Sequence, residues 1–160
     1  MNGDSKKVKF EDLDLFSLLR LEHLSPEKKA ERIAEIQAIV MNNFFLDDLA
    51  KLLSEEDMKK FDNLAKDPAK SGELEEFLRS KVPELDRIIF EKMLTAKREI
   101  VRKNIKTRLD INEKESGDRD VQTNKQRMDA LAQEKEKLEK ILSSIETDDL
   151  ETASNLIVTL

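Results

Sequence analysis

The sequence has no cysteine, tryptophan or tyrosine, and only three glycines and three prolines in 160 residues. Without cysteine, disulfides, thiolate metal sites and thiol nucleophiles are excluded. The glycines are isolated and the GxxxxGK[ST], GxGxxG and GxSxG patterns are missing, so the chain cannot build a phosphate-cradling loop or a nucleophile elbow of those types. The absence of tryptophan and tyrosine also removes two residue types that often anchor binding interfaces.

Long apolar runs are missing as well. No stretch approaches the roughly 20 apolar residues of a membrane-spanning helix. The N-terminal segment carries basic residues but lacks the apolar run of a signal peptide. The sequence therefore predicts a soluble, cytoplasmic protein that makes no membrane contact.

What the sequence does contain favours helices. Charged residues make up 40% and apolar residues 38%, and glutamate, lysine, leucine, alanine and isoleucine are frequent. The net charge of −6 favours solubility and argues against a protein devoted to nucleic acid. We expect an all-α fold, a compact multi-helix bundle with one long central helix and an amphipathic C-terminal helical arm.

The long helix is predicted from Pro83 to Leu109, because proline suits the first helical position and neither proline nor glycine follows. At helical spacing its apolar residues fall into two stripes, so the helix must be covered from both sides. The first stripe consists of Leu85, Ile88, Ile89, Met93, Ala96 and Ile100. The second stripe consists of Phe90, Leu94, Val101, Ile105 and Leu109.

Start signals and changes in composition suggest the domain organisation. A short helix is expected over Phe10–His23, and Ser25-Pro26 and Ser54 are expected to begin later helices, with a bend or break near Asn42-Asn43 between them. We expect a mobile N-terminus over residues 1–9, a helical domain over residues 10–109, a polar linker over residues 110–124 and the amphipathic arm over residues 125–160. The linker can also be read as a solvated continuation of the long helix.

Three blocks of the chain carry a resemblance. They are a Pro-Glu-Lys opening within Ser25–Lys28, an LSEED block over Leu53–Phe61, and an FL…P…II block over Phe77–Ile89. With these blocks, residues 18–101 resemble a small uncharacterised family of bacterial helical proteins. The motifs are mostly helix caps and core positions, and the family has no assigned activity. The resemblance therefore implies a helical fold and no particular function.

The sequence contains few of the residues from which catalytic and metal sites are usually built. The only histidine, His23, is expected at a helix end, where it would interact with the helix dipole or cap carbonyl groups. With no second histidine and no cysteine, a transition-metal site lacks ligands. The acidic clusters are read as solvated helix caps. We therefore expect no enzyme, no catalytic residues, no metal, no cofactor and no small-molecule substrate.

A basic stripe lies on the long helix, where Arg98, Arg102 and Lys106 follow at intervals of four residues. It could contact the phosphates of a nucleic acid, or an anionic protein partner. No aromatic residues interleave for base stacking. The simpler interpretation is that positive charge suits the later turns of a helix and pairs with the acidic remainder of the chain.

The C-terminal arm carries a heptad seam that contains one lysine. The seam consists of Met128, Leu131, Lys135, Leu138, Leu142 and Ile145. It can cover the second stripe by folding back as an antiparallel hairpin, or both surfaces can meet another chain. We therefore predict a non-enzymatic helical protein-binding module, an adaptor, scaffold or small acidic chaperone, that binds a partner helix or associates with itself. The alternative is a nucleic-acid-associated protein that uses the basic stripe.

Overall fold

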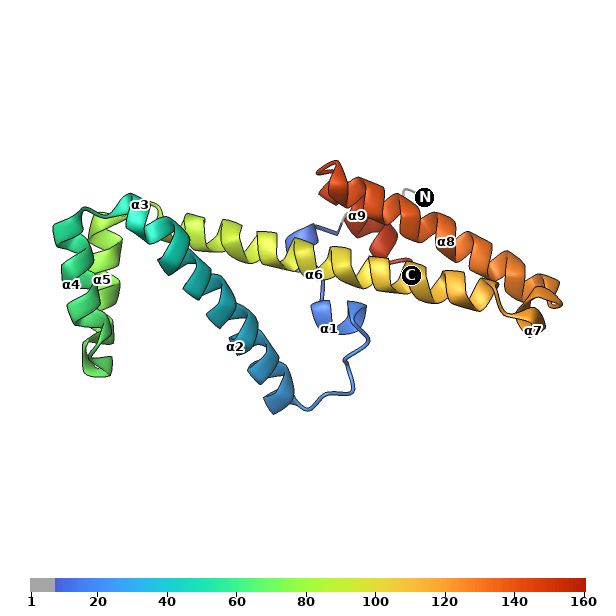
Figure 1. Cartoon of the computed structure of the whole chain (residues 1–160), viewed down its shortest axis with the longest axis horizontal. Coiled ribbons are helices and arrows are strands. Elements are labelled where there is room, and N and C mark those ends of the chain that lie inside the picture. The colour runs from blue at the N-terminus through green and yellow to red at the C-terminus, as the bar shows by residue number, and fades with distance from the viewer. Residues whose placement is uncertain (1–7) are drawn as a thin grey trace, which may run out of the picture. The chain divides into compact units, whose positions relative to one another are not determined.

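The computed structural model describes residues 8–160, in which all regular secondary structure is helical and no β-strand occurs. The predicted all-α fold, with one long helix, is therefore confirmed (Figure 1). The expected mobility of residues 1–9 falls, up to residue 7, outside the described part of the chain. The chain divides into two units: residues 25–96 form the central unit, and residues 1–24 together with 97–160 form the terminal unit.

This division differs from the expected single domain over residues 10–109. The reason is that the N-terminal segment packs on the part of the long helix that follows Ala96. The Nζ atom of Lys97 donates a hydrogen bond to the carbonyl oxygen of Glu11 at 2.6 Å and lies 5.9 Å from the centre of the Phe10 ring. The guanidinium of Arg108 donates to the carbonyl oxygen of Leu18. Sequence reasoning missed these contacts because they join residues far apart in the chain.

The central unit consists of helices joined by short turns. They are α2 (Pro26–Asn43), the π-helix η2 (Phe44–Leu49), α3 (Ala50–Leu52), α4 (Glu55–Ala65), the 3-10 turn η3 (Pro68–Lys70), α5 (Ser71–Lys81) and the first part of α6 (Leu85–Ser116). Both predicted caps are present: the hydroxyl of Ser25 accepts from the Lys28 N–H at 3.4 Å, and that of Ser54 from the Asp57 N–H at 3.1 Å. These bonds satisfy N–H groups that have no partner inside the helix.

The expected bend or break near Asn42-Asn43 is not a break. The backbone stays helical through Asn43 (φ −63°, ψ −40°), and the helix widens into η2 instead of stopping. Phe44 and Leu49, at the two ends of η2, are both buried. A π-turn has more residues per turn than an α-turn. The sequence signal at the asparagines therefore marks a change of helix type and not an end.

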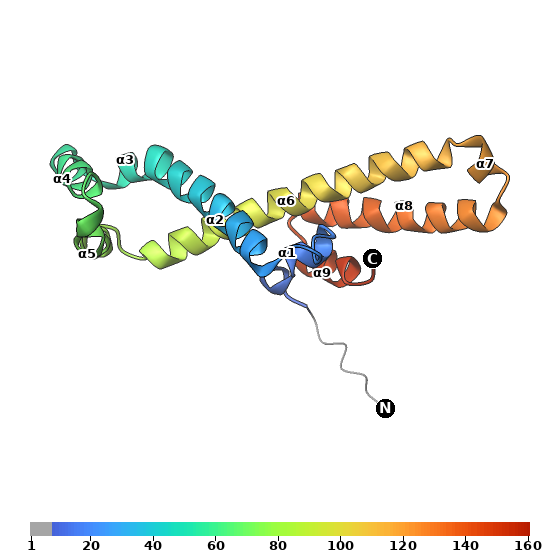
Figure 2. The ribbon, with the colours of Figure 1, turned by 90° about the horizontal axis from the view of Figure 1, so that it is seen from below.

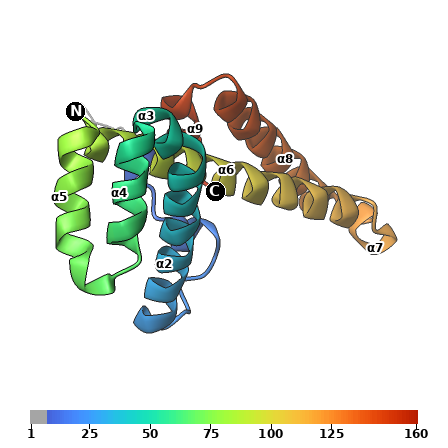
Figure 3. The same ribbon diagram turned by 60° about the vertical axis from the view of Figure 1, so that its left-hand side comes forward.

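The core of the central unit is formed by aromatic and aliphatic side chains from four of its helices and the connecting turns. Its buried members are Phe44, Leu49, Leu53, Phe77, Leu78, Val82 and Leu85. Ile88 and Ile89 of the first stripe pack against this core, as predicted for that stripe. Helices α4 and α5 lie side by side (Figure 3), with an ion pair between Lys81 and Asp57 at 3.2 Å.

Helix α6 has different ends from the predicted ones. It begins at Leu85 and not at Pro83, because Glu84 adopts a left-handed conformation with φ of 61°. It continues to Ser116, through the first half of the expected linker, and ends where Gly117 follows. No proline or glycine interrupts this stretch, so its polar residues can extend the helix. The expected linker is therefore a continuation of the long helix up to Ser116. The short helix α7 (Arg119–Gln122) follows it.

In the terminal unit, α8 (Lys125–Glu146) runs back along α6 as an antiparallel hairpin (Figure 2). Arg127 Nε donates to the Glu115 carboxylate at 2.7 Å near the turn of this hairpin. Helix α9 (Leu150–Ile157) follows α8 and contacts both α8 and the 3-10 turn η1 (Phe10–Asp12). The buried apolar residues of this unit are Phe10, Leu13, Leu18, Val101, Ile105, Leu131, Leu138, Ile141, Ile145, Ala153 and Ile157.

The single helix expected over Phe10–His23 is also wrong. The segment forms η1 and the four-residue helix α1 (Leu15–Leu18), separated by Leu13 in an extended conformation. The carboxylate of Asp14 caps α1 by accepting from the Phe16 N–H at 3.0 Å. Arg20, with φ of 56°, turns the chain away after α1. The extended Leu13, the cap at Asp14 and the left-handed Arg20 thus interrupt a pattern that is apolar enough for one helix.

Candidate functional site

The structure places most of the predicted interaction residues inside the terminal unit. Val101 and Ile105 of the second stripe are buried, and so are Leu131, Leu138 and Ile145 of the seam. Four others are half-buried, namely Leu94, Leu109, Met128 and Leu142. Phe90 alone of the predicted set is exposed, at 54%. The hairpin of α6 and α8 therefore uses these side chains within one chain.

Two details of the hairpin differ from the predicted seam. Ile141 is fully buried, whereas its neighbour Leu142 is only half-buried, so the seam is rotated by one residue at that turn. Lys135, expected at a core position, keeps its ammonium group 3.8 Å from Glu113 and 4.0 Å from Glu139 at the edge of the hairpin.

The polar residue inside the hairpin is instead Asn112 of α6, which is 2% exposed. Its Nδ2 donates to the carbonyl oxygen of Leu131 at 2.9 Å. Its buried Oδ1 accepts no hydrogen bond from the described residues. The burial of Asn112 could not be recognised from the sequence, because this residue lies in a polar stretch expected to be a solvated connection.

The predicted basic stripe is largely occupied by contacts within the chain. Arg98 forms an ion pair with Asp148 at 2.6 Å and donates to the carbonyl oxygen of Ile145 at 2.8 Å. Arg102 pairs with Glu99 at 3.0 Å. Lys106 is exposed. Two of the three cations thus support the hairpin and α6 itself, as the simpler interpretation of the stripe predicts.

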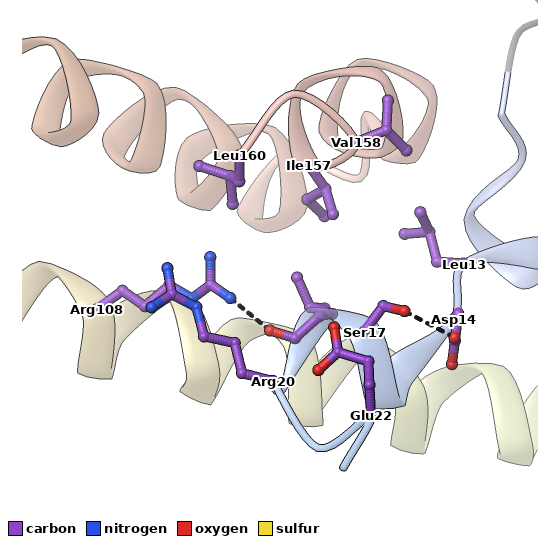
Figure 4. Close-up of a pocket in the computed structure, with 10 residues that line it drawn as sticks. Leu13, Asp14, Ser17, Arg20, Glu22, Arg108, Ile157, Val158 and Leu160 are labelled. Atoms are coloured by element: carbon purple, nitrogen blue, oxygen red, sulfur yellow. Dashed lines mark hydrogen bonds between the residues drawn. The ribbon is translucent and has the colours of Figure 1, made fainter.

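A cavity of about 420 Å³ lies in the terminal unit between the N-terminal segment, α6 and the end of the chain (Figure 4). Leu13, Leu18, Ile157, Val158 and Leu160 contribute its apolar side chains. Asp14, Ser17, Arg20, Glu22 and Arg108 contribute its polar groups. A volume of this size falls within the range of about 300–1,000 Å³ that is typical of small-molecule sites.

The polar groups of this cavity are distributed unevenly. The guanidinium groups of Arg20 and Arg108 lie together on one side, and Asp14 and Ser17 lie on the other (Figure 4). The Asp14 carboxylate is already engaged, because it accepts from the Phe16 N–H at 3.0 Å and from the Ser17 hydroxyl at 2.8 Å. One side of the cavity is therefore cationic.

The arginine pair is electrostatically unfavourable as it stands. Burial lowers the pKa of the Arg108 guanidinium, and the neighbouring charge of Arg20 lowers it further, whereas Glu134 opposes the shift. Within residues 8–160, neither arginine forms an ion pair with a carboxylate. Both arginines also line an adjoining cavity of about 210 Å³, together with Glu134 and Asn104.

The central unit has an apolar seam of its own on its outer surface. Ile39 and Leu46 are exposed at 62% and 69%, although large aliphatic side chains are usually buried. Ile36 is half-buried and Asn43 is exposed on the same side of α2 and η2. The α2 seam, defined as Ile36, Ile39, Asn43 and Leu46, has the 3-4-3 spacing of a helix-pairing surface. The exposure of Ile39 and Leu46 could not be recognised from the sequence, because large aliphatic side chains are usually buried.

The described residues place no metal site and no membrane-spanning segment on this fold. No group of three or more histidine, aspartate or glutamate side chains in residues 8–160 is arranged to hold a metal ion. Over the same residues, every helix is too short or too polar to cross a bilayer.

Comparison of the chain with protein-family models, curated proteins and solved structures finds no match. The resemblance of residues 18–101 to bacterial helical proteins therefore stays a prediction. What the fold defines is an all-α protein of two helical units. Its function has to be argued from its surfaces and cavities.

Proposed function

We propose that the protein is a non-enzymatic helical module that binds a partner protein through the α2 seam of the central unit. The observation that carries this proposal is the exposure of Ile39 and Leu46 on the continuous helical segment formed by α2 and η2. Fully burying one such side chain stabilises a complex by about 1.5–3 kcal/mol. The proposed binding surface is thus the α2 seam and not the second stripe with the C-terminal arm, because the apolar residues of those two are largely covered within the terminal unit.

The proposed occupant is an amphipathic helix of another protein. A surface with 3-4-3 spacing fits the side chains of a second helix, and a polar residue at one core position sets the register of such a pair. Asn43, between Ile39 and Leu46, occupies such a position. Asp47, next to Leu46, has an exposed carboxylate, whereas the Glu35 carboxylate pairs with Arg32 at 2.9 Å. With the net charge of −6, this favours a helix with basic flanks over a second copy of this acidic chain.

The basic stripe offers less support for binding of a nucleic acid. Arg98 and Arg102 of the basic stripe already pair with Asp148 and Glu99. A nucleic acid would have to compete with both ion pairs for the two guanidinium groups. The basic stripe therefore remains the weaker alternative.

Photo-cross-linking tests the α2 seam. A photoreactive phenylalanine analogue replaces Ile39 in the full chain, and Ala65, exposed at the end of α4, serves as the control position. The protein is irradiated alone and in an extract of its source organism. We expect a discrete adduct with another protein from position 39 and none from position 65. We expect Leu46→Glu to abolish this adduct, because it places a charge in the seam.

Leu52→Glu is the matched control variant, because Leu52 is also exposed, at 48%, but lies on α3 outside the seam. It should leave the adduct intact, and circular dichroism should show both variants folded. Equal loss in the two variants, or equal adducts from positions 39 and 65, would overturn the proposal. An adduct of twice the chain mass from the purified protein alone would identify a second copy as the occupant and exclude a heterologous partner.

A further inference from the structure

The cavity of the terminal unit has the features of a ligand site that the proposed function does not use. It combines an apolar wall with two neighbouring arginines that form no ion pair with any carboxylate of the described residues. Two like charges held together repel each other, and partial burial weakens the screening by water. A bound anion between the guanidinium groups would reduce this repulsion and supply the direct ion pair that Glu134 does not form with either arginine.

We propose that this cavity binds a small anionic amphiphile, a carboxylate with an unbranched aliphatic chain, and that Arg20 and Arg108 hold its head group. Guanidinium groups bind carboxylates through short, charge-assisted hydrogen bonds. The Arg108 side chain is held in place by its hydrogen bond to the carbonyl oxygen of Leu18. Arg20 reaches the same side of the cavity from the turn after α1, where its left-handed backbone fixes the direction of the chain.

The remainder of the cavity suits the aliphatic chain. Leu13, Leu18, Ile157 and Val158 all line the cavity. Figure 4 shows Ile157, at the end of α9, on the side opposite the N-terminal segment. The two acidic residues that line it do not block the head group. Asp14 is engaged as the cap of α1 on the opposite side, and Glu22 is exposed and unpaired with either arginine. The cavity is thus cationic on one side and apolar along its wall, which matches an amphiphile of opposite polarity.

Isothermal titration calorimetry with decanoate tests this inference on the full chain. We expect saturable binding of one decanoate per chain. Decanol has the same chain without the charge, and acetate has the charge without the chain. Both should bind at least about tenfold more weakly, because a charge-assisted hydrogen bond or a buried aliphatic chain each contributes about this factor or more.

Variants assign the binding to the cavity. Arg20→Gln should weaken decanoate binding by about tenfold or more, whereas Arg102→Gln, on α6 but outside the cavity, should leave it unchanged. Val158→Trp should also weaken binding, because the exposed Val158 side chain lines the cavity and a larger one would fill it. Thermal unfolding of each variant checks that the fold is retained.

Three outcomes would overturn the inference. The first is no saturable binding of decanoate by the wild-type chain. The second is equal binding of decanol and decanoate, which would show that the arginines do not contribute to binding. The third is equal weakening by Arg20→Gln and Arg102→Gln, which would indicate a general charge effect. None of these results bears on the cross-linking at Ile39, because the two sites lie in different units.

Discussion

Asn112 offers the sharpest test of how the hairpin is stabilised. Replacing it by leucine, which has a similar branched shape, removes a polar side chain from the apolar contact between α6 and α8. The change loses one hydrogen bond to the carbonyl oxygen of Leu131, which contributes about 1 kcal/mol. It also removes the unpaired Oδ1, whose burial costs about 1–3 kcal/mol, and adds apolar contact. We therefore expect Asn112→Leu to raise the free energy of unfolding of the hairpin by about 1 kcal/mol.

Amide hydrogen exchange of peptides from α8 measures this change in the unit concerned. A gain of about 1 kcal/mol should slow the exchange of the most protected α8 amides by about fivefold. Asn63→Leu is the matched control, because Asn63 is exposed on α4 of the central unit, and its effect should stay within about 0.5 kcal/mol. Faster exchange of α8 in Asn112→Leu would refute the reasoning, because the asparagine would then stabilise the hairpin more than its unpaired oxygen destabilises it.

Three further changes test the core, a cap and an electrostatic contact. Ile105→Ala should lower the free energy of unfolding by about 2–5 kcal/mol in denaturant titrations, because Ile105 is fully buried between α6 and its neighbours. Ser54→Ala should cost about 1 kcal/mol in the same assay, because the Asp57 N–H loses its acceptor. Hydrogen bonds from the Thr152 hydroxyl and N–H hold the pKa of Asp149 below its usual value of about 3.9. The cap therefore stabilises α9 fully above that pH, and its contribution is lost as the pH falls through the lowered pKa. Asp149→Asn should make the unfolding of α9 less dependent on pH below about pH 4, as followed by circular dichroism; an unchanged pH dependence would contradict this assignment.

The two proposed sites rest on different kinds of observation. The α2 seam is a local property of one helical segment, which needs no long-range contact to form. The cavity exists only because the segment around α1, the helix α6 and the end of α9 come together, so it depends on the fold of the terminal unit. A variant that unfolds the terminal unit should therefore abolish decanoate binding, while the seam itself stays within the central unit.

The sequence by itself determined the local features of the fold. Composition and the near absence of glycine and proline specified helices, and the hydroxyls of Ser25 and Ser54 specified two of their starts. The two stripes of the long helix correctly required cover on both sides, and the polar stretch after Leu109 could be read as a helical continuation. These features follow from interactions between residues a few positions apart, which periodicity and capping rules describe.

The tertiary structure alone decided which surface covers each stripe. Only the packing of α8 on α6 shows that Ile141 and not Leu142 is buried, that Lys135 reaches the edge, and that Asn112 lies inside. The position of the N-terminal segment on α6, and with it the meeting of Arg20 and Arg108, is likewise a long-range contact. A sequence pattern gives the angular position of a side chain on its own helix, but the partner helix and its rotation depend on the competition between all the apolar faces of the chain.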